Sequence, residues 1–194
     1  MRAVACISWL LLSALIAGVC GCLPPRPAPP LPGVTLQPGR YLEAFYRDPE
    51  FVPERNAFLL EPFTVEVGLG ISADTFQNMF QEELRKAWEA NGLTLKALED
   101  ACRVSGAVHR VSFSGSVYRF LLGKISADLS VSGAITQGEK TRFAFQDRIH
   151  ITTPVKPGRA APKETELLLR QAIQEFAAHL LNELLLQGLP PAEG

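Results

Sequence analysis

The stretch from Ile125 to Ile151 alternates apolar and polar side chains, and this pattern limits the possible folds more than any other. In its first half the odd positions are mostly apolar, whereas the even positions from 126 to 132 carry Ser or Asp. In its second half most odd positions hold Phe or Ile, and most even positions hold Arg, Gln or His. A period of two is typical of strands with one buried and one solvated face. With Gln137-Gly138-Glu139 between the halves, the pattern predicts a long β-hairpin.

Two segments have the spacing of amphipathic helices, and each needs another element to cover its apolar side. Residues 72–91 carry an apolar stripe from Phe76 to Trp88, with Ser72 placed to cap the helix start. Residues 164–187 carry a second stripe of Leu, Ile and Phe, which stops at Gly188-Leu189-Pro190. Two such helices and a one-sided sheet indicate that each covers the other's apolar surface.

Shorter strand-like runs complete the predicted domain. They lie at 58–67, where Pro62 indicates an edge or bulged strand, at 93–98, and at 101–113, where Gly106 is a candidate bulge. The predicted fold is α+β, a two-layer sandwich in which a mostly antiparallel sheet of about four strands is packed by two helices. The expected order is β-α-β-β-β-β-α.

The predicted organisation is a single domain with short extensions. We expect residues 57–188 to form that domain, after a lead-in segment at 39–56 and before a tail at 189–194. The lead-in mixes aromatic and charged residues, and we expect it to pack against the domain.

The N-terminus has the features of an export signal. Arg2 precedes a stretch from Ala3 to Val19 that contains no charged residue and is rich in Leu. This length is typical of the apolar part of a signal peptide and marginal for a transmembrane helix. A transmembrane anchor is the alternative, but its usual flanking pattern is missing. Residues 1–21 are therefore predicted to be a signal peptide.

Small residues lead directly into a cysteine at the end of this stretch. The sequence Val19-Cys20-Gly21 before Cys22 resembles the lipobox of bacterial lipoproteins. Cys20 is a poorer acceptor, because branched Val19 would then occupy the cleavage position. The resemblance implies lipidation at Cys22, and because Leu23 is not Asp, it implies an outer-membrane location with the domain facing the periplasm. More than one acyl chain is needed for stable attachment.

Residues 22–38 form a Pro-rich tether between the predicted anchor and the domain. Six of the eleven residues from Leu23 to Gly33 are Pro. Such runs favour polyproline II, which is extended and lacks internal hydrogen bonds. The tether acts either as a spacer that holds the domain away from the lipid or as a disordered leader, and the sequence leaves both readings open.

Composition excludes several function classes. The formal net charge of the chain is −1, and removal of residues 1–21 takes away one further positive charge, so no overall attraction to nucleic acid is expected. Cys102 is then the only thiol that is not removed or acylated, which excludes a disulfide framework. Because Cys102 lies in an apolar run, we predict a buried, inert thiol.

Candidate catalytic motifs are weak. Gly68-Leu69-Gly70-Ile71-Ser72-Ala73 matches a dinucleotide-binding pattern, but the following acids lie about 30 residues on, where about 20 is usual. We therefore expect a glycine turn and no cofactor. His109, His150 and His179 lie on separate predicted elements without metal-ligand spacing, so no metal site is expected. We do not expect an enzyme.

Two surface clusters are candidates for contacts. The first is basic and has no acidic residue between its last four members; it is a rim for anionic lipid or a partner, or an ordinary solvated loop. Its members are Arg142, Arg148, Lys156, Arg159 and Lys163. The second is an apolar connection between two cations, which inserts into a partner or membrane interface or continues a strand into the core. Its members are Arg119, Phe120, Leu121, Leu122 and Lys124.

With the lipobox at Cys22 and the strand–helix–strands–helix order over 57–187, the chain resembles the small outer-membrane lipoproteins of the LptE type. Auxiliary lipoproteins of ABC-type lipid transporters share these features and are the competing resemblance. The first implies an accessory protein in envelope biogenesis, aiding lipopolysaccharide or lipid transport or outer-membrane assembly through a protein partner, either an outer-membrane barrel or a transport complex. It also implies possible contact with lipopolysaccharide or phospholipid. A free-standing binder of lipid or a small apolar ligand is the alternative.

Overall fold

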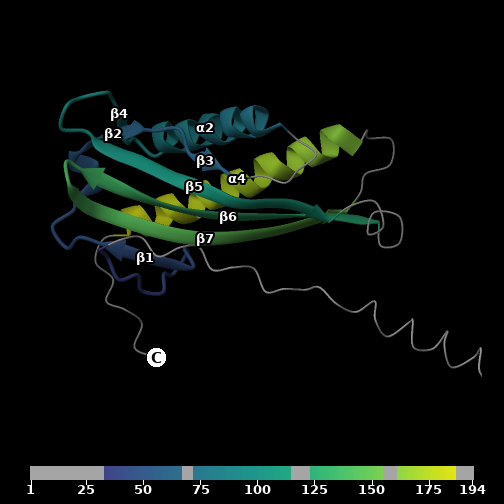
Figure 1. Cartoon of the computed structure of the whole chain (residues 1–194), viewed down its shortest axis with the longest axis horizontal. Helices are drawn as coiled ribbons and strands as arrows, with labels where there is room; N and C mark the ends of the chain where they lie inside the picture. Colours follow the sequence, from purple (N-terminus) through teal and green to yellow (C-terminus); the bar gives the residue numbers. More distant parts are fainter. Residues whose placement is uncertain (1–32, 67–71, 115–122, 155–160, 187–194) are drawn as a thin grey trace, which may run out of the picture.

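The computed structural model describes residues 33–66, 72–114, 123–154 and 161–186. Figure 1 shows long strands with helices running along them. In chain order the elements are β1 (Ala44–Arg47), the 3-10 helix η1 (Pro53–Arg55), β2 (Ala57–Leu60), β3 (Thr64–Val65), α2 (Ala73–Ala90), β4 (Thr94–Leu95), β5 (Cys102–Ser114), β6 (Lys124–Gln137), β7 (Lys140–Pro154) and α4 (Ala161–Leu185).

The strands form one mixed sheet of seven strands. Its order is β1-β7-β6-β5-β2-β4, and β3 pairs with β5. Neighbours among β1, β7, β6 and β5 run antiparallel, whereas β2 pairs in parallel with both β4 and β5, and β3 also runs parallel to β5. The class α+β is correct, but the prediction of a mostly antiparallel sheet of about four strands, in the order β-α-β-β-β-β-α, is wrong.

Two physical reasons account for this difference. Helix α2 lies between β3 and β5 in the chain. It carries the chain back to the end of the sheet where β3 begins, so β5 runs in the same direction as β3. The additional edge strand β1 comes from the predicted lead-in and pairs with β7 through Ala44↔Gln146 to Arg47↔Phe143. Its four residues are too few to show a clear alternation.

The predicted hairpin is confirmed. Strands β6 and β7 pair antiparallel from Lys124↔Pro154 at one end to Gln137↔Lys140 at the other. Gly138 in the turn has φ +59°, in the left-handed region that favours glycine. The odd apolar positions of β6 are buried and contribute to the core, as the alternation predicted.

Helices α2 and α4 cover the apolar face of the sheet. Ser72 caps α2, and its side chain accepts a hydrogen bond from the Thr75 backbone N–H at 3.2 Å. Between the helices and the sheet, the Phe176 ring lies 5.7 Å from Phe80 and 5.9 Å from Phe145. Of the helices in the described part of the chain, none combines the length and the apolar character needed to cross a membrane.

Gly106 leaves space for the ring of Phe63. The register shift in β5 lies further along the strand. The register of β5 against β6 shifts between Val108 and Arg110, so the expected bulge at Gly106 is not the one observed. Gly106 pairs with Gly133, and a Cβ added at Gly106 would lie 2.5 Å from a Phe63 ring carbon. The two glycines therefore allow close approach of side chains on the core face.

Polar contacts fix the segment before β1 to the body. Glu183 on α4 is buried, and its carboxylate accepts hydrogen bonds from the backbone N–H groups of Tyr41 at 2.7 Å and Leu42 at 3.3 Å. Arg47 donates to the carbonyls of Leu184 at 3.1 Å and Leu186 at 2.7 Å, which satisfies the end of α4. The lead-in is therefore held to α4 by its backbone and by one arginine.

Candidate functional site

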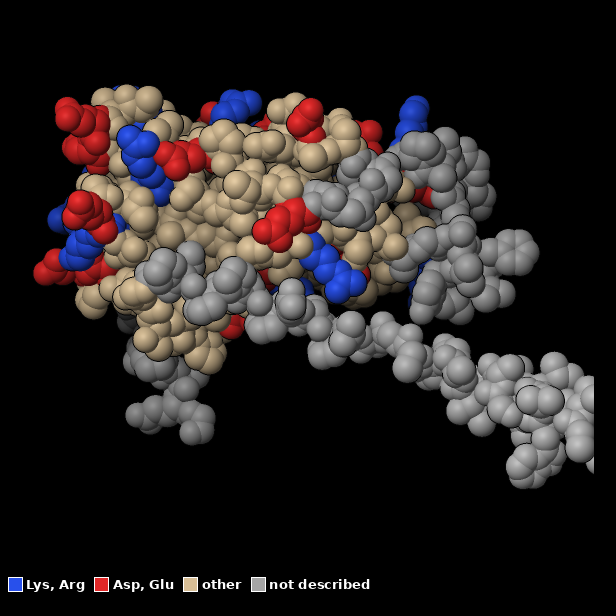
Figure 2. Space-filling view, in the orientation of Figure 1, with Lys and Arg blue, Asp and Glu red and all other residues tan. Residues whose placement is uncertain are grey.

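The face of the sheet that points away from α2 and α4 is the main candidate surface, and we call it the open face. It carries the even positions of β6, whose odd positions belong to the core. Serine is its most frequent residue on β6. Figure 2 shows that charges gather at the end of the molecule near the β6–β7 turn and are sparse over the middle of the face in view.

Strand register brings two arginines together on the open face. Arg110 on β5 pairs with Ser130 on β6, and Ser130 pairs with Arg148 on β7. We call these three residues the arginine row. Directly opposite Cβ atoms in such pairs lie about 5 Å apart, which places the two arginine Cβ atoms about 10 Å apart across the serine. Both arginines are exposed.

A hydrogen-bonded chain occupies the next row of the open face. The His150 Nδ1 lies 2.8 Å from Asp128 Oδ1, and its Nε2 lies 3.1 Å from the Thr152 hydroxyl. Ser112 donates to the other Asp128 oxygen at 3.4 Å. The order acid–His–hydroxyl is that of a nucleophilic triad. However, the side chains of His150 and Asp128 are 60% and 39% exposed, so they lack the water-excluded environment in which such groups act strongly.

Of the described members of the predicted basic cluster, Arg142 and Arg148 lie six residues apart on β7, and Lys163 lies on α4. Arg142 lies near the turn end of β7, about 40 Å from Pro154 at the other end at the usual rise of roughly 3.3 Å per residue. Lys163, in the first turn of α4, is exposed and follows the loop after Pro154. Lys156 and Arg159 lie outside the described residues. Only Arg148 of the predicted set lies in the arginine row.

Arg142 has a structural partner. Its Nη1 lies 2.7 Å from Asp48 Oδ2, and Lys140 Nζ lies 2.7 Å from the same oxygen. Hydrogen bonds from Lys140 and then Arg142 lower the Asp48 pKa to about 2, against the opposing effect of burial. Arg142 is therefore committed to joining β7 to the segment after β1.

Part of the predicted apolar tip can be placed. Lys124 is exposed at the start of β6, opposite Pro154. Arg119, Phe120, Leu121 and Leu122 lie outside the described residues, as does Cys22. Next to Lys124, a small apolar cluster of Ile125, Ala127 and Leu168 closes this end of the core. The described ends of the two predicted contact segments therefore lie side by side.

Glu83 on α2 forms the most connected buried polar group between the helices. Its carboxylate accepts from Arg170 Nη1 and Gln174 Nε2 on α4, both at 2.7 Å, and from Lys86 at 3.2 Å. Burial opposes ionisation of Glu83, but the hydrogen bonds from Gln174, Arg170 and Lys86 outweigh it and lower its pKa. This arrangement holds α2 against α4 and leaves no free functional group.

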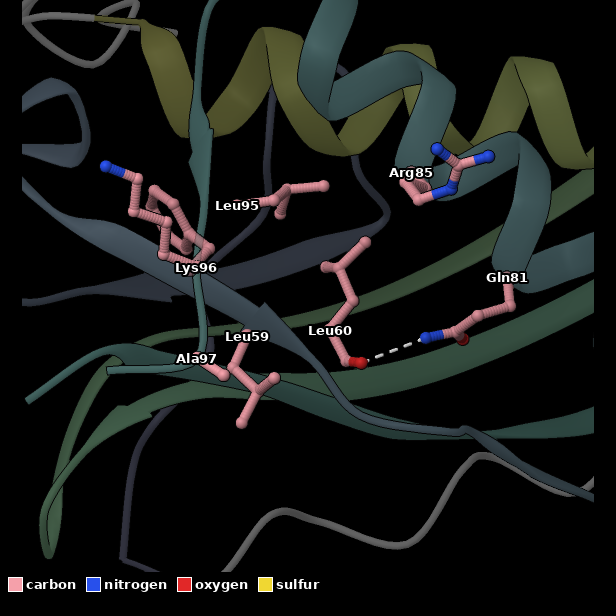
Figure 3. A pocket seen from close by; sticks show the side chains of 8 residues that line it. Leu59, Leu60, Gln81, Arg85, Leu95, Lys96 and Ala97 are labelled. Atoms are coloured by element: carbon pink, nitrogen blue, oxygen red, sulfur yellow. Dashed lines mark hydrogen bonds between the residues drawn. The ribbon is translucent and has the colours of Figure 1, made fainter. Parts of the chain in front are cut away.

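A shallow groove of about 260 Å³ lies between α2 and the edge of β2, and Figure 3 shows the side chains around it. Its walls include Leu59, Leu60 and Leu95, and Arg85 and Lys96 add positive charge. Gln81 Nε2 donates to the Leu60 carbonyl at 3.0 Å, which covers part of the strand edge. The lining suits a small apolar group that carries a negative charge.

The remaining candidate groups lie apart. Cys102 is fully buried, and burial raises the pKa of its thiol, so its thiolate is disfavoured. His109, His150 and His179 lie on β5, β7 and α4. His179 Nδ1 lies 2.9 Å from buried Asp147 on β7, a polar residue at a position where the alternation predicted an apolar one. Within the described ranges, no cluster of His, Cys, Asp and Glu has a composition that could hold a metal ion.

Arg110 is the candidate residue that sequence reasoning missed. It lies in the run at 101–113, which was expected to be a strand, but its face depends on the register shift between Val108 and Arg110. That shift changes which residues of β5 share a face with Ser130. The sequence signal was the polar character of Arg110 within an apolar run, and it did not identify the neighbour.

No protein-family model and no curated protein matches the sequence. Among solved structures, a minor lipoprotein from Acinetobacter baumannii is 16% identical with a TM-score of 0.44, covering 64% of this chain and 88% of that chain. Rare lipoprotein B from Shewanella oneidensis is 18% identical with a TM-score of 0.42, covering 66% and 92%. The PelC dodecamer from Paraburkholderia phytofirmans is 10% identical with a TM-score of 0.43, covering 75% and 98%. At these values the similarities do not assign a family to the chain.

Proposed function

We propose that this protein is a lipid-anchored accessory protein of the bacterial outer membrane, with its domain facing the periplasm. It aids lipopolysaccharide or lipid transport, or outer-membrane assembly, by binding a protein partner. The partner is an outer-membrane barrel or a transport complex, including an ABC-type lipid transporter. The lipobox sequence ending at Cys22 supports the anchor, and the open face supports the binding role.

The open face is the main structural support for the hypothesis of a protein partner. Three of its β6 residues are serines, whose short side chains let another backbone approach the sheet closely. Exposed Arg110 and Arg148 add the residue type that is enriched at the energetic centres of protein interfaces. A protein partner that covers this face would bury hydroxyl groups and pair these two charges.

The anchor is tested by acylation in cells. We expect labelled palmitate to be incorporated into the full-length protein and the label to disappear in Cys22→Ala. Cys20→Ala is the matched control and keeps the label, because Cys20 lies before the proposed cleavage site. Retention of the label in Cys22→Ala, or its loss only in Cys20→Ala, contradicts the proposed anchor.

The partner is tested by photocrosslinking from the open face. A photoreactive amino acid at Ser130 is expected to give one discrete adduct with an envelope protein in intact cells. The same amino acid at Glu89, an exposed position on α2 remote from the sheet's open face, serves as the control. Equal adducts from both positions, or none from Ser130, contradict a partner on the open face.

The groove between α2 and β2 favours a second function, binding of a small apolar ligand. Its leucine walls and the cations Arg85 and Lys96 suit a short acyl chain with an acidic head group. Native mass spectrometry of the full-length protein with decanoate tests this function. Binding that is lost in Leu95→Asp and kept in Leu98→Asp supports it, because Leu98 is exposed and outside the groove lining.

A further inference from the structure

The arginine row differs electrostatically from three other arginines of the sheet and the helices. Arg103, Arg142 and Arg170 each have a guanidinium nitrogen within 2.9 Å of a carboxylate oxygen. Arg110 has no ion pair within the described part of the chain. The Arg148 guanidinium lies 3.9 Å from the Glu43 carboxylate. Two like charges therefore flank one serine with little neutralisation.

Repulsion between the two arginines lowers the stability of the folded protein when no ligand is bound to the row. Arg110 on β5 and Arg148 on β7 both flank β6, so their like charges repel each other across that strand. The Ser130 hydroxyl between them is half-buried and makes no hydrogen bond to another described residue. The row therefore presents two guanidinium groups and one hydroxyl donor on the same side of the sheet.

These donors suit a phosphoryl group. Guanidinium groups bind phosphate oxygens in a bidentate manner, and such charge-assisted bonds are stronger than neutral ones. Both arginine side chains are long enough to reach a group that lies above Ser130. The short serine leaves space for that group and offers it a third donor.

The charges around the row distinguish a single phosphoryl group from a membrane surface. Asp128 lies in the adjacent row, hydrogen-bonded to His150, and Glu43 lies beside Arg148. A uniformly anionic bilayer that covered the row would also face both carboxylates. A single group held between the arginines would avoid them. We propose that Arg110, Ser130 and Arg148 bind the phosphoryl group of a soluble phosphate monoester, a site that goes beyond the accessory role proposed above.

The test uses the full-length lipidated protein in nanodiscs of neutral phosphatidylcholine, with glycerol 3-phosphate as the probe. We expect saturable binding by calorimetry, with glycerol inactive and acetate much weaker at the same ionic strength. Arg110→Gln and Arg148→Gln should each weaken binding about tenfold, as expected for loss of one charge-assisted contact. Arg103→Gln is the matched control, because it removes the same charge from β5 where the arginine pairs with Glu61, and it should bind as the wild type does.

Three results would overturn the proposal. The first is binding that Arg103→Gln weakens as much as the row variants, since this would indicate a general effect of charge. The second is equal affinity for acetate, which would indicate a carboxylate site. The third is absence of glycerol 3-phosphate binding together with row-dependent binding to phosphatidylglycerol vesicles, which would assign the row to a membrane surface. None of these results affects the acylation and crosslinking experiments, so the proposed function is tested separately.

Discussion

The two faces of the sheet differ in the type of side chain that they carry and in how their charges are paired. The face under α2 and α4 is filled by aromatic rings, and the buried Glu83 between the helices receives hydrogen bonds from Arg170 and Gln174. The open face carries short polar side chains, and the arginine row lacks close neutralising partners. Charge on the core side is paired because unpaired buried charge is costly. On the open side solvent tolerates unpaired charge, and this leaves donors free for a ligand.

The largest effect is expected from removing the central aromatic ring of the core face. Phe176→Ala should lower the free energy of unfolding by about 3–5 kcal/mol, because the ring is fully buried against Phe80 and Phe145. Denaturant unfolding of the full-length protein measures this change. Ser130→Ala on the open face is the control and should change it by less than about 0.5 kcal/mol. Similar losses in both variants would remove the distinction between the faces.

The hydrogen bonds of Glu83 to Arg170 and Gln174 allow a test of how much buried charge between the helices contributes to stability. Glu83→Ala should lower the free energy of unfolding by about 2–3 kcal/mol, since Gln174 loses its acceptor and Arg170 loses its closest carboxylate partner. Glu82→Ala is the matched control on the same helix, because exposed Glu82 pairs mainly with Lys86 and should change the free energy of unfolding much less. A larger loss in Glu82→Ala than in Glu83→Ala would contradict this ranking.

The Asp48 cluster predicts a pH dependence at the turn end of the sheet. Because the folded Asp48 pKa is depressed from 3.8 to about 2, its contribution is complete above the unfolded value and is lost as the pH falls through about 2. Asp48→Asn should lower the free energy of unfolding by about 1–2 kcal/mol at pH 7 and show a smaller loss between pH 4 and pH 2. Chemical denaturation across this range measures both effects.

Glu50→Gln provides the comparison for Asp48. Glu50 is exposed and lies 3.5 Å from Lys140, so its replacement should keep the acid dependence of the wild type. If Asp48→Asn and the wild type lose the same stability between pH 4 and pH 2, Asp48 is not the titrating group.

The smallest effect is expected on the open face. Arg110→Gln should leave the free energy of unfolding unchanged or raise it by about a few tenths of a kcal/mol, because it relieves like-charge repulsion with Arg148 across β6. Thermal unfolding at low ionic strength measures the change, and added salt should reduce it. Arg142→Gln, which breaks the ion pair to Asp48, is the contrasting variant and should destabilise. A clear destabilisation by Arg110→Gln would mean that the row has a structural role.

The sequence allowed the regular elements to be predicted where the pattern was long. The alternation over 125–151 identified the β6–β7 hairpin, and helical spacing with a Ser72 cap identified α2. Strands β2, β3 and β4 contain only two to four residues each. Such lengths show too few alternations to specify orientation, so their parallel pairing with each other or with β5 was not predicted.

For the candidate site, the sequence shows the type of each residue but does not show which residues lie close together. The sequence identifies Arg148 as a basic residue on the wet face of its strand, but it groups Arg148 with Arg142 near the start of β7 and with Lys163 on α4. Arg110 was overlooked because its position on the open face depends on the register shift in β5. Neighbours across a sheet come from pairing between distant segments, which local sequence does not encode.

The sequence by itself determined which segments must be buried and, through the resemblance at Cys22, where the protein is expected to be anchored. Apolar periodicity is a property of the local sequence, so it can be recognised without knowledge of the fold. Only the tertiary structure decided which charges are neutralised and which are free. Pairing of Arg142 with Asp48 and the alignment of Arg110 with Arg148 both follow from strand register, which is fixed when the whole apolar face packs against α2 and α4.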